Sequence, residues 1–352
     1  MKHTDNIILN KLQRKTTDII PLWHKQILNW YQQYGRNTLP WRNLNGDNAP
    51  YGVYVSEIML QQTQVKRVLE SYYTPFMTSF PTLQSLAIAD EENVLKHWEG
   101  LGYYTRARNM QKTAQICCEK FNNALPQTYA ELISLPGIGA YSAGAILCFG
   151  FKQSVSFVDG NIRRLLCRIF ALQNATMPLL EELSTILLDQ KHSFDYNQAL
   201  LDIGATICTP KSPSCLLCPV HNLCDGYTNP TLYPKPKKSH LHPLELHLAL
   251  CIDANGKIAF IQGDKSGLYQ GLYNLPNLEK EQVVSYEKCG SFKHHYTKYA
   301  ITANVYIINQ DTFKHLVPQT NLYFFSYQEL DSKPLSSLCK KALKFVDSKK
   351  SK

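Results

Sequence analysis

Four cysteines stand close together in one stretch of the chain, separated by six, two and five residues: Cys208, Cys215, Cys218 and Cys224. Four thiolates on one loop can surround a single compact metal centre. Zinc is one candidate occupant, although this spacing differs from the two Cys-x-x-Cys pairs typical of zinc ligands. An iron–sulfur cluster is the other candidate. The remaining seven cysteines are scattered in mostly apolar surroundings, which indicates small buried side chains in a reducing compartment.

A proline–glycine turn and an aspartate form a second pattern. Leu135-Pro136-Gly137-Ile138-Gly139 lies between two helical segments, and its glycines let the backbone turn tightly against a phosphate. Asp159 follows about twenty residues later, just before another expected helix, where it is either an N-cap or a functional anion. Three arginines give that helix a basic side, which is either a solvated face or a phosphate contact: Arg163, Arg164 and Arg168.

Helical periodicity extends to about Asp225 and is expected to position these groups. One helix face carries apolar residues at spacings of three and four: Ile162, Leu165, Leu166, Ile169 and Phe170. A second stripe predicts one helix from Ser56 onward: Ile58, Val65, Val68 and Tyr72. Glu57 is then expected at the N-terminus of that helix, where the helix dipole lowers the pKa of a carboxyl group.

The composition changes after Cys224. The stretch 227–243 is rich in proline and lysine, which predicts an extended linker. Beyond it the pattern is typical of strands, and Asn255-Gly256 predicts a hairpin turn between Leu246–Ile252 and Lys257–Ile261. The other expected elements are two strands, a helix and a frayed basic tail: Ile301–Ile308, Leu322–Tyr327, Leu335–Val346 and Ser348–Lys352.

The composition of all 352 residues bounds the class of protein. Hydrophobic residues make up 44% of the chain, which is enough to form cores. No apolar run approaches the roughly 18–20 residues of a membrane helix, and residues 1–10 lack the apolar core of a secretory signal. We therefore expect a soluble cytoplasmic protein. A net charge of +9 favours polyanionic partners.

Longer motifs resemble a known enzyme family. Leu135–Ala145 followed by Asp159 is similar to the helix–hairpin–helix glycosylase superfamily. Three further stretches resemble the adenine DNA glycosylase (MutY) family: Thr38–Trp41, Ser56–Val65 and Gly100–Arg108. The likeness spans nearly the whole chain and is strongest from about Gly35 to Cys224.

The resemblance implies an architecture and its partners. The fold is expected to be a mainly α, two-lobed helix–hairpin–helix glycosylase with an iron–sulfur loop, followed by a C-terminal α+β MutT-like (Nudix-like) domain. Residues 1–41 and 153–226 would form the cluster lobe, 42–152 a six-helix lobe, 227–243 the linker and 244–352 the lesion-recognition domain. The four clustered cysteines would bind a 4Fe–4S cluster. The expected partner is double-stranded DNA with an adenine mispair, bound by a monomer at the nucleoid.

The same resemblance implies roles for site residues. Glu57 would protonate adenine mispaired with 8-oxoguanine or guanine, and Asp159, beside Asn161, would stabilise the cationic sugar. Two carboxyl groups with unlike roles suit cleavage of an N-glycosidic bond. Burial must then raise the pKa of Glu57 against the helix dipole. The implied DNA contacts are Gln62 and Tyr103 as wedges, together with Arg106, Arg108, Gly137 and Gly139.

Tyr141 separates two kinds of glycosylase. The endonuclease III relatives have a lysine here, which attacks the sugar through a Schiff base and then cuts the strand. A phenol cannot form that imine, so we expect base excision without efficient lyase activity. The alternatives are a bifunctional endonuclease III-like glycosylase and AP lyase acting on oxidised pyrimidines, and a catalytically silent mismatch sensor.

The C-terminal part resembles a MutT-like lesion-recognition domain. Nucleotide-diphosphate hydrolases share that fold, but they need a carboxylate-rich helix for magnesium, which does not follow Gly271–Pro276. The family commonly reads oxidised guanine with Phe-Ser-His, whereas this chain has Tyr296-Thr297-Lys298. The resemblance therefore implies lesion contacts by Tyr296 and Thr297.

Overall fold

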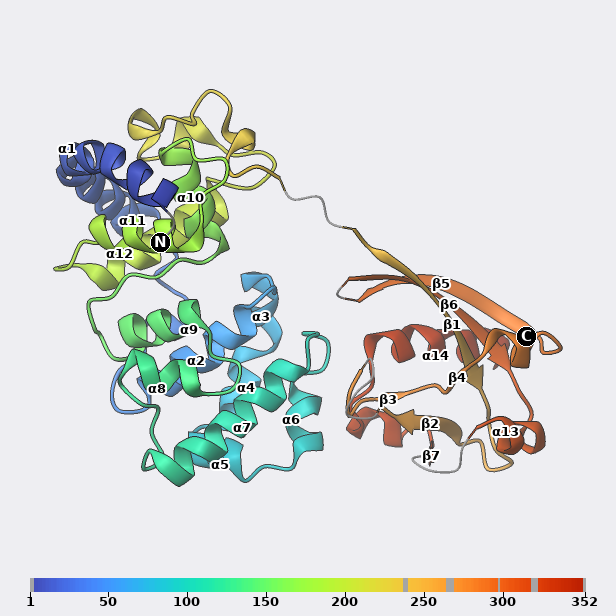
Figure 1. Cartoon of the computed structure of the whole chain (residues 1–352). Helices are drawn as coiled ribbons and strands as arrows, with labels where there is room; N and C mark the ends of the chain where they lie inside the picture. The colour runs from blue at the N-terminus through green and yellow to red at the C-terminus, as the bar shows by residue number, and fades with distance from the viewer. Residues whose placement is uncertain (1–2, 237–239, 264–268, 297, 318–321, 351–352) are drawn as a thin grey trace. The chain divides into compact units, whose positions relative to one another are not determined.

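The computed structural model describes residues 3–236, 240–263, 269–296, 298–317 and 322–350 (Figure 1). The chain forms two compact units. The first comprises Met1–Met77, Thr82–Gln84 and Thr113–Lys237, and the second comprises Thr78–Pro81, Ser85–Lys112 and Lys238–Lys352. None of the helices in the described ranges is long and apolar enough to cross a bilayer.

The first unit is helical. Its helices are α1 (His3–Tyr34), α2 (Ala49–Leu60), α3 (Val65–Ser71), α4 (Tyr73–Ser79), α8 (Tyr129–Ser134), α9 (Ala140–Ala145), α10 (Gly160–Ile169), α11 (Met177–Ile186) and α12 (Ser193–Thr206). Between α4 and α8 the chain forms α5 (Leu83–Ala87), α6 (Glu91–His97) and α7 (Thr105–Lys120), of which α6 lies wholly in the second unit.

Helix α2 is the centre of the first unit. Every residue from Ala49 to Met59 is buried, as in a helix enclosed on all sides. Pro50 occupies its first turn, where a missing N–H leaves no helical bond unmade. The predicted single helix from Ser56 to Tyr72 is wrong, because α2 ends at Leu60 and α3 begins at Val65. Glu57 therefore lies in the last turn of α2 and not at its N-terminus.

The predicted helix–hairpin–helix is confirmed as α8, a turn, and α9. Gly137 has a φ of +78°, a left-handed conformation that side chains disfavour, so the turn depends on glycine here. Helix α9 continues directly into a π-helical turn, η2 (Ile146–Gly150). Helix α9 contacts α2, and the two lie side by side in Figure 1.

Helix α10 confirms the apolar face predicted around Leu165 and Leu166. It crosses α12 closely, since a Cβ on Gly204 would approach Asn161 Cβ to 2.5 Å. The four clustered cysteines follow α12 on a loop that contains the 3-10 turns η3 (Cys215–Leu217) and η4 (His221–Leu223). The crossing of α10 and α12 thus connects the Asp159 turn with the start of the cysteine loop.

The strands lie in the second unit and form two sheets (Figure 1). They are β1 (His242–Leu250), β2 (Ile258–Gln262), β3 (Tyr273–Asn274), β4 (Asn277–Leu278), β5 (Lys288–Tyr296), β6 (Tyr299–Ile307) and β7 (Leu322–Phe325). One sheet has the order β4-β1-β6-β5, in which β1 and β6 are parallel, and the other has the order β3-β2-β7. Helix α13 (Gln310–Leu316) precedes β7, and α14 (Ser337–Lys350) contacts both β5 and β3.

Two expectations for this region need correction. The turn at Asn255-Gly256 exists, with Gly256 at φ +76°, and Ile252 and Ile258 form an antiparallel bridge beside it, but beyond this bridge β1 and β2 join different sheets. The reason is that β1 pairs along its whole length with the distant strand β6. The tail predicted to fray from Ser348 is helical through Lys350. The strand predicted at Ile301–Ile308 is confirmed as β6, and the linker predicted at 227–243 overlaps the start of β1 at His242.

Candidate active site

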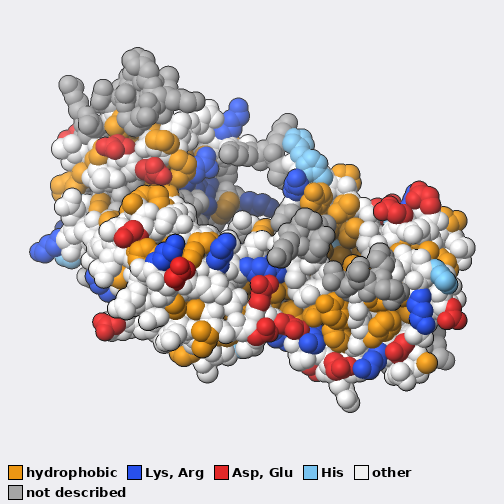
Figure 2. Space-filling view, turned by 60° about the horizontal axis from the view of Figure 1, so that its bottom comes forward, with side chains coloured by type: hydrophobic (Ala, Val, Ile, Leu, Met, Phe, Trp, Pro, Cys, Tyr) orange, Lys and Arg blue, Asp and Glu red, His pale blue; other side chains and the backbone are white. Residues whose placement is uncertain are grey.

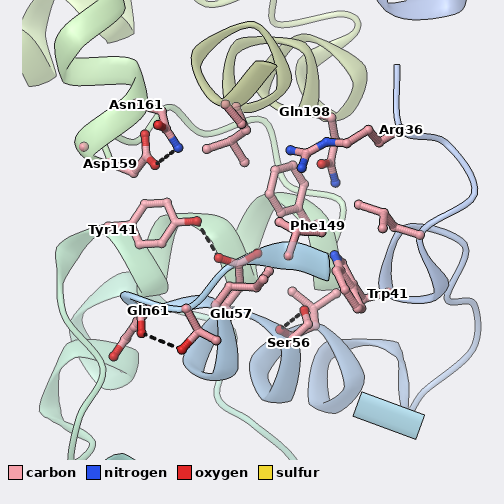
Figure 3. Close-up of a pocket in the computed structure, with 18 of the residues that line it drawn as sticks. Arg36, Trp41, Ser56, Glu57, Gln61, Tyr141, Phe149, Asp159, Asn161 and Gln198 are labelled. Carbon is pink, nitrogen blue, oxygen red and sulfur yellow. Dashed lines mark hydrogen bonds between the residues drawn. The ribbon is translucent and has the colours of Figure 1, made fainter. Parts of the chain in front are cut away.

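A pocket of about 550 Å³ opens in the first unit (Figure 3). Its walls come from α2, the turn after it, the segment before η1 (Pro40–Arg42), the start of α9 and of α10, and α12. The structure brings five predicted residues together on these walls: Glu57, Gln62, Tyr141, Asp159 and Asn161. Apolar side chains from η1, α2 and η2 make up much of the remaining surface.

Glu57 is a buried acid, with 5% of its surface exposed. Burial raises its pKa to about 7, helped by the charge of Asp159, while the hydrogen bond from Tyr141 and the charge of Arg42 oppose the shift. Its position near the C-terminus of α2 means that the helix dipole disfavours the carboxylate and acts in the same direction as burial. At neutral pH this group can therefore donate a proton.

Asp159 is an N-cap that also lines the pocket. Its Oδ1 accepts a hydrogen bond from the backbone N of Ile162 at 2.7 Å, which makes it the N-cap of α10. Its Oδ2 accepts a bond from Asn161 Nδ2 at 3.0 Å and faces the pocket (Figure 3). Burial raises the pKa of Asp159, while these hydrogen bonds and the nearby Arg164 favour its charged form. The carboxylate is thus held in one orientation on the wall of the pocket.

Tyr141 lies between the two carboxyl groups in Figure 3. Its phenol donates a hydrogen bond to Glu57 Oε2 at 2.5 Å, and its ring meets Phe157 edge-on with 5.5 Å between centroids. Burial, followed by the charges of Glu57 and Asp159, raises the pKa of Tyr141 well above its usual value. The side chain is therefore a neutral hydrogen-bond donor beside the acid.

The two predicted wedge residues share an unusual backbone conformation. Gln62 has a φ of +57° and Tyr103 a φ of +48°, both in the left-handed region that non-glycine residues rarely adopt. Such conformations cluster at sites where backbone strain serves binding. Gln62 lines the pocket, and Tyr103 lies in the second unit.

The two arginines beside Tyr103 are engaged within the second unit. Arg106 is buried and donates hydrogen bonds to the carbonyl oxygens of Leu101 and Gly102 at 3.2 and 3.1 Å. Burial lowers the pKa of Arg106 to about 10. Its guanidinium therefore supports the turn that leads into Tyr103. Arg108 forms an ion pair of 2.8 Å with Glu91 on α6.

Neither the backbone conformation nor the surrounding side chains require a glycine at position 139. A Cβ at this position would meet no atom within 4 Å, and its φ of −99° suits any residue. The open space lies at the N-terminus of α9, where backbone N–H groups have no helical partners. The position suits the close approach of an external group better than internal packing.

The cysteine loop brings its four thiols within electrostatic reach of one another. Burial and, to a smaller extent, the charges of the other three thiols together raise the pKa of Cys218 to about 12. The described residues hold no group of three His, Cys, Asp or Glu side chains arranged around a single metal ion. Arg168 Nη1 donates to Cys208 Sγ at 3.2 Å, a type of hydrogen bond that tunes iron–sulfur clusters. The donors available here are the four thiols of the loop and the N–H of Arg168 from α10, a set whose chemistry suits a cluster.

Two of the three arginines on α10 bind the cysteine loop. Arg168 is buried and binds the carbonyl oxygens of Thr209 and Pro210 at 2.8 and 3.1 Å. Arg164 Nε donates to the carbonyl oxygen of Cys208 at 2.7 Å. These side chains hold the cysteine loop against α10. Arg163 lines the pocket.

The lesion-contact prediction is only partly within the described structure. Tyr296 ends β5, and its ring packs against that of Tyr269 with 4.5 Å between centroids. Thr297 lies outside the described residues. Lys298 follows in the turn to β6, where its carbonyl oxygen accepts a bond from the backbone N of His242 at 2.8 Å.

Several pocket residues had been assigned no role from the sequence: Arg36, Trp41, Arg42, Phe149 and Gln198. A signal was available for the first three, because they lie in or beside the Thr38–Trp41 motif. Phe149 and Gln198 lie within apolar helical segments and carry no local signal. Figure 3 shows their side chains on the same side of the pocket as Arg36 and Trp41.

The surface charge does not by itself outline a binding face. In the view of Figure 2, lysine and arginine side chains are interspersed with aspartate and glutamate. This face therefore carries charged groups of both signs. The pocket and its two carboxyl groups are the more specific indication of function.

The fold and the pocket define a class of protein. Residues 55–188 match the model of the HhH-GPD superfamily of base excision DNA repair proteins. A thermostable thymine-DNA glycosylase has a similar fold, with a TM-score of 0.55 and 24% identity, covering 61% of this chain and 98% of that one. The chain is thus a DNA glycosylase of this superfamily, a hydrolase of N-glycosyl bonds.

Curated relatives identify the family. An adenine DNA glycosylase of Buchnera aphidicola is 37% identical over 310 residues, which cover 86% of this chain and 84% of the relative. The human adenine DNA glycosylase is 44% identical over 209 residues, but the match spans only 38% of the human protein and 56% of this chain. The chain belongs to the adenine DNA glycosylase family.

Proposed function

We propose that this enzyme removes adenine mispaired with 8-oxoguanine or guanine in double-stranded DNA, acting as a monomer at the nucleoid. The observation that carries the proposal is the pocket with a protonatable acid, Glu57, and a fixed anion, Asp159, on its walls. A flipped purine needs both groups, one for the base and one for the sugar.

The reaction follows from the positions of these groups. Glu57 gives its proton to a ring nitrogen of adenine, and the N-glycosidic bond then breaks with its electron pair going to the base. Asp159, held by Ile162 N and Asn161, stabilises the positive charge that develops on the sugar. Water adds to the sugar carbon and releases a proton, which leaves an abasic site and free adenine.

Tyr141 favours the monofunctional form of this reaction. Its buried phenol already donates to Glu57 and has no amine with which to form a Schiff base. The endonuclease III-like alternative would require a nucleophilic lysine, and the described residues that line the pocket include none. We therefore assign excision without strand cleavage.

The cysteine loop is assigned a 4Fe–4S cluster held by Cys208, Cys215, Cys218 and Cys224. When bound, the cluster would supply a rigid link within the loop and no chemistry on the base. Arg164 and Arg168 tie the same loop to α10, the helix that Asp159 caps. The protein's own residues thus connect the loop to the pocket wall.

DNA binding is assigned to the residues implied by the family. Gln62 and Tyr103, both with left-handed backbones, would enter the stack beside the lesion. Gly137 and Gly139 would admit a phosphate at the N-terminus of α9, and Arg106 would act by supporting the Tyr103 turn. We assign the sheets of the C-terminal region to a Nudix-like lesion-recognition domain in which Tyr296 and Thr297 contact oxidised guanine. Arg108 would contact the backbone of the DNA beside them.

A single-turnover assay tests the proposal on a duplex with adenine opposite 8-oxoguanine. The proposal predicts cleavage at the adenine only after alkali treatment. Cutting without alkali would support the bifunctional alternative, and a mobility shift without cleavage would support a silent sensor. Glu57→Gln should slow excision by about 10²–10⁴-fold, the usual contribution of a general acid. Excision at the parental rate by this variant would rule out the assigned chemistry.

A further inference from the structure

A fully buried carboxylate joins two arginines of the pocket wall. Asp202 on α12 has 0% of its surface exposed. Its Oδ1 accepts hydrogen bonds from Arg36 Nε at 2.7 Å and Arg42 Nη2 at 2.6 Å. Its Oδ2 accepts bonds from the backbone N of Arg36 and from Arg42 Nη1, both at 2.8 Å. Both arginines line the pocket, whereas Asp202 does not.

Asp202 carries a charge in this setting. Burial alone raises its pKa, but the hydrogen bonds and charge of Arg42, followed by Arg36, outweigh burial and lower it. Bidentate pairing of a guanidinium with a carboxylate holds both groups in one plane. Arg42 is therefore fixed by both of its terminal nitrogens, and the ring of Tyr31 packs 5.9 Å from its guanidinium carbon.

The fixed guanidinium acts on the catalytic acid. Arg42 is buried, and its Nε has no hydrogen-bond partner among the described residues. Its charge opposes the upward shift in the pKa of Glu57. The other groups that act on Glu57 are Tyr141 from α9 and Asp159 at the start of α10. Arg42 belongs to η1 and lines the same pocket as Glu57, so its cation lies on the wall that the acid shares.

We propose that Asp202 is a positioning residue for base excision: it holds Arg42 and Arg36 on the wall of the pocket, so that the Arg42 cation keeps its place beside the Glu57 acid. The proposal rests on the function assigned above and extends it to a residue that does not line the pocket. Without Asp202 the two guanidinium groups would repel each other and lose three hydrogen bonds, and the backbone N of Arg36 would lose a fourth. Arg42 would then move, and the acid would lose a neighbour that stabilises its charged form.

The test compares Asp202→Asn with Asp189→Asn. Asp189 is a suitable control because it is also a buried carboxylate of the first unit. It accepts hydrogen bonds from the backbone N of Lys191 and His192 at 3.0 Å. Asp189 is not among the residues that line the pocket of Glu57. Loss of fold alone should affect both variants, and circular dichroism identifies any variant that has not folded.

The expected results concern the rate and its pH dependence. Asp202→Asn should slow single-turnover adenine release by about 10–100-fold, the effect of a misplacement near 1 Å at a reacting centre. It should also move the alkaline limb of the pH–rate profile upward, because the Glu57 carboxylate loses the Arg42 charge. If Arg42 instead kept its place in Asp202→Asn, loss of the Asp202 charge would lower the pKa of Glu57 and move that limb downward. This result would refute the proposal. Asp202→Glu should restore part of the rate.

A second variant keeps the proposal testable if Asp202→Asn does not fold. Arg42→Lys retains the charge but cannot make the bidentate pair, so it should show the same upward movement of the limb. Parental behaviour of Arg42→Lys would refute the proposal. Where both variants fold, their effects on the rate should be strongly non-additive, since one residue acts through the other. Additive effects would show that Asp202 does not act through Arg42.

A carboxyl-carbon NMR titration of Glu57 in DNA-free protein separates this inference from the assigned function. The pKa of Glu57 should be higher in Asp202→Asn than in the parent, whatever the substrate. Failure of the parent protein to release adenine, with the NMR shift present, would overturn the assigned substrate alone. An unchanged Glu57 titration would overturn the positioning role.

Discussion

Replacing Glu57 by glutamine should stabilise the folded protein above pH 7, besides slowing excision. Burial raises the pKa of this carboxyl group from 4.5 to about 7 in the folded chain. Between these pH values the folded state keeps a proton that the unfolded state has released, so stability falls as the pH rises through this window. A shift of about 2.5 pH units at about 1.4 kcal/mol each corresponds to about 3 kcal/mol as an upper limit.

Urea unfolding at pH 5 and pH 8 measures this effect. Tryptophan fluorescence suits the purpose, because Trp23 and Trp41 are buried in the same unit as Glu57. Glu57→Gln should resemble the parent at pH 5 and exceed it in free energy of unfolding by up to about 3 kcal/mol at pH 8. Glu70→Gln is the matched control, because the Glu70 side chain is 57% exposed and makes only a 3.8 Å pair with Lys66.

The change in the stability difference between pH 5 and pH 8 tests whether Glu57 holds a proton in the folded protein. Glu57→Gln and the parent could differ in free energy of unfolding by the same amount at pH 5 and pH 8. That result would show that burial does not set the proton affinity of Glu57. A variant less stable than the parent at pH 8 would show that the carboxylate form is the better accommodated one. Either result would refute the assignment of Glu57 as a proton donor at neutral pH.

Three further predictions concern neighbouring groups. Tyr141→Phe removes a bond that favours the Glu57 carboxylate, so the alkaline limb of the pH–rate profile should move up by about one unit; an unmoved limb would contradict this. Gly139→Ala should leave the unfolding temperature unchanged but weaken duplex binding, measured by fluorescence anisotropy, whereas Gly204→Ala should lower that temperature because its Cβ meets Asn161 at 2.5 Å. Borohydride should trap little protein on substrate DNA, and strong capture would contradict the role given to Tyr141.

Local signals in the sequence predicted the features that depend on a few adjacent residues. Asp159 caps α10 because a carboxylate before a helix accepts its free N–H groups. Gly137 shapes the hairpin because its φ of +78° suits glycine. The spacing of the clustered cysteines, from Cys208 to Cys224, predicts a metal centre, which stays a prediction. The identity of Tyr141 was enough to predict the absence of a Schiff base.

Helix limits and strand partners depended on distant parts of the chain. Apolar residues on both sides of Gln61–Gln64 suggested one helix, but α2 ends at Leu60 and leaves Glu57 in its last turn. The turn at Asn255-Gly256 suggested a hairpin, but antiparallel pairing is limited to a bridge at Ile252 and Ile258, and β1 pairs in parallel with β6, 57 residues further along. Turn chemistry acts locally, whereas strand pairing is decided by which faces are buried together.

The sequence by itself determined which chemical groups this glycosylase has, namely an acid, an anion, a phenol and four thiols. The protonation states of these groups, and the groups that lie next to them, depend on the tertiary structure. The pKa of Glu57 rises to about 7 because the surrounding helices exclude water from it. Arg42 meets Asp202 across 160 residues of chain. No local pattern records such a pairing, because desolvation and charge pairing depend on distances in space and not along the sequence.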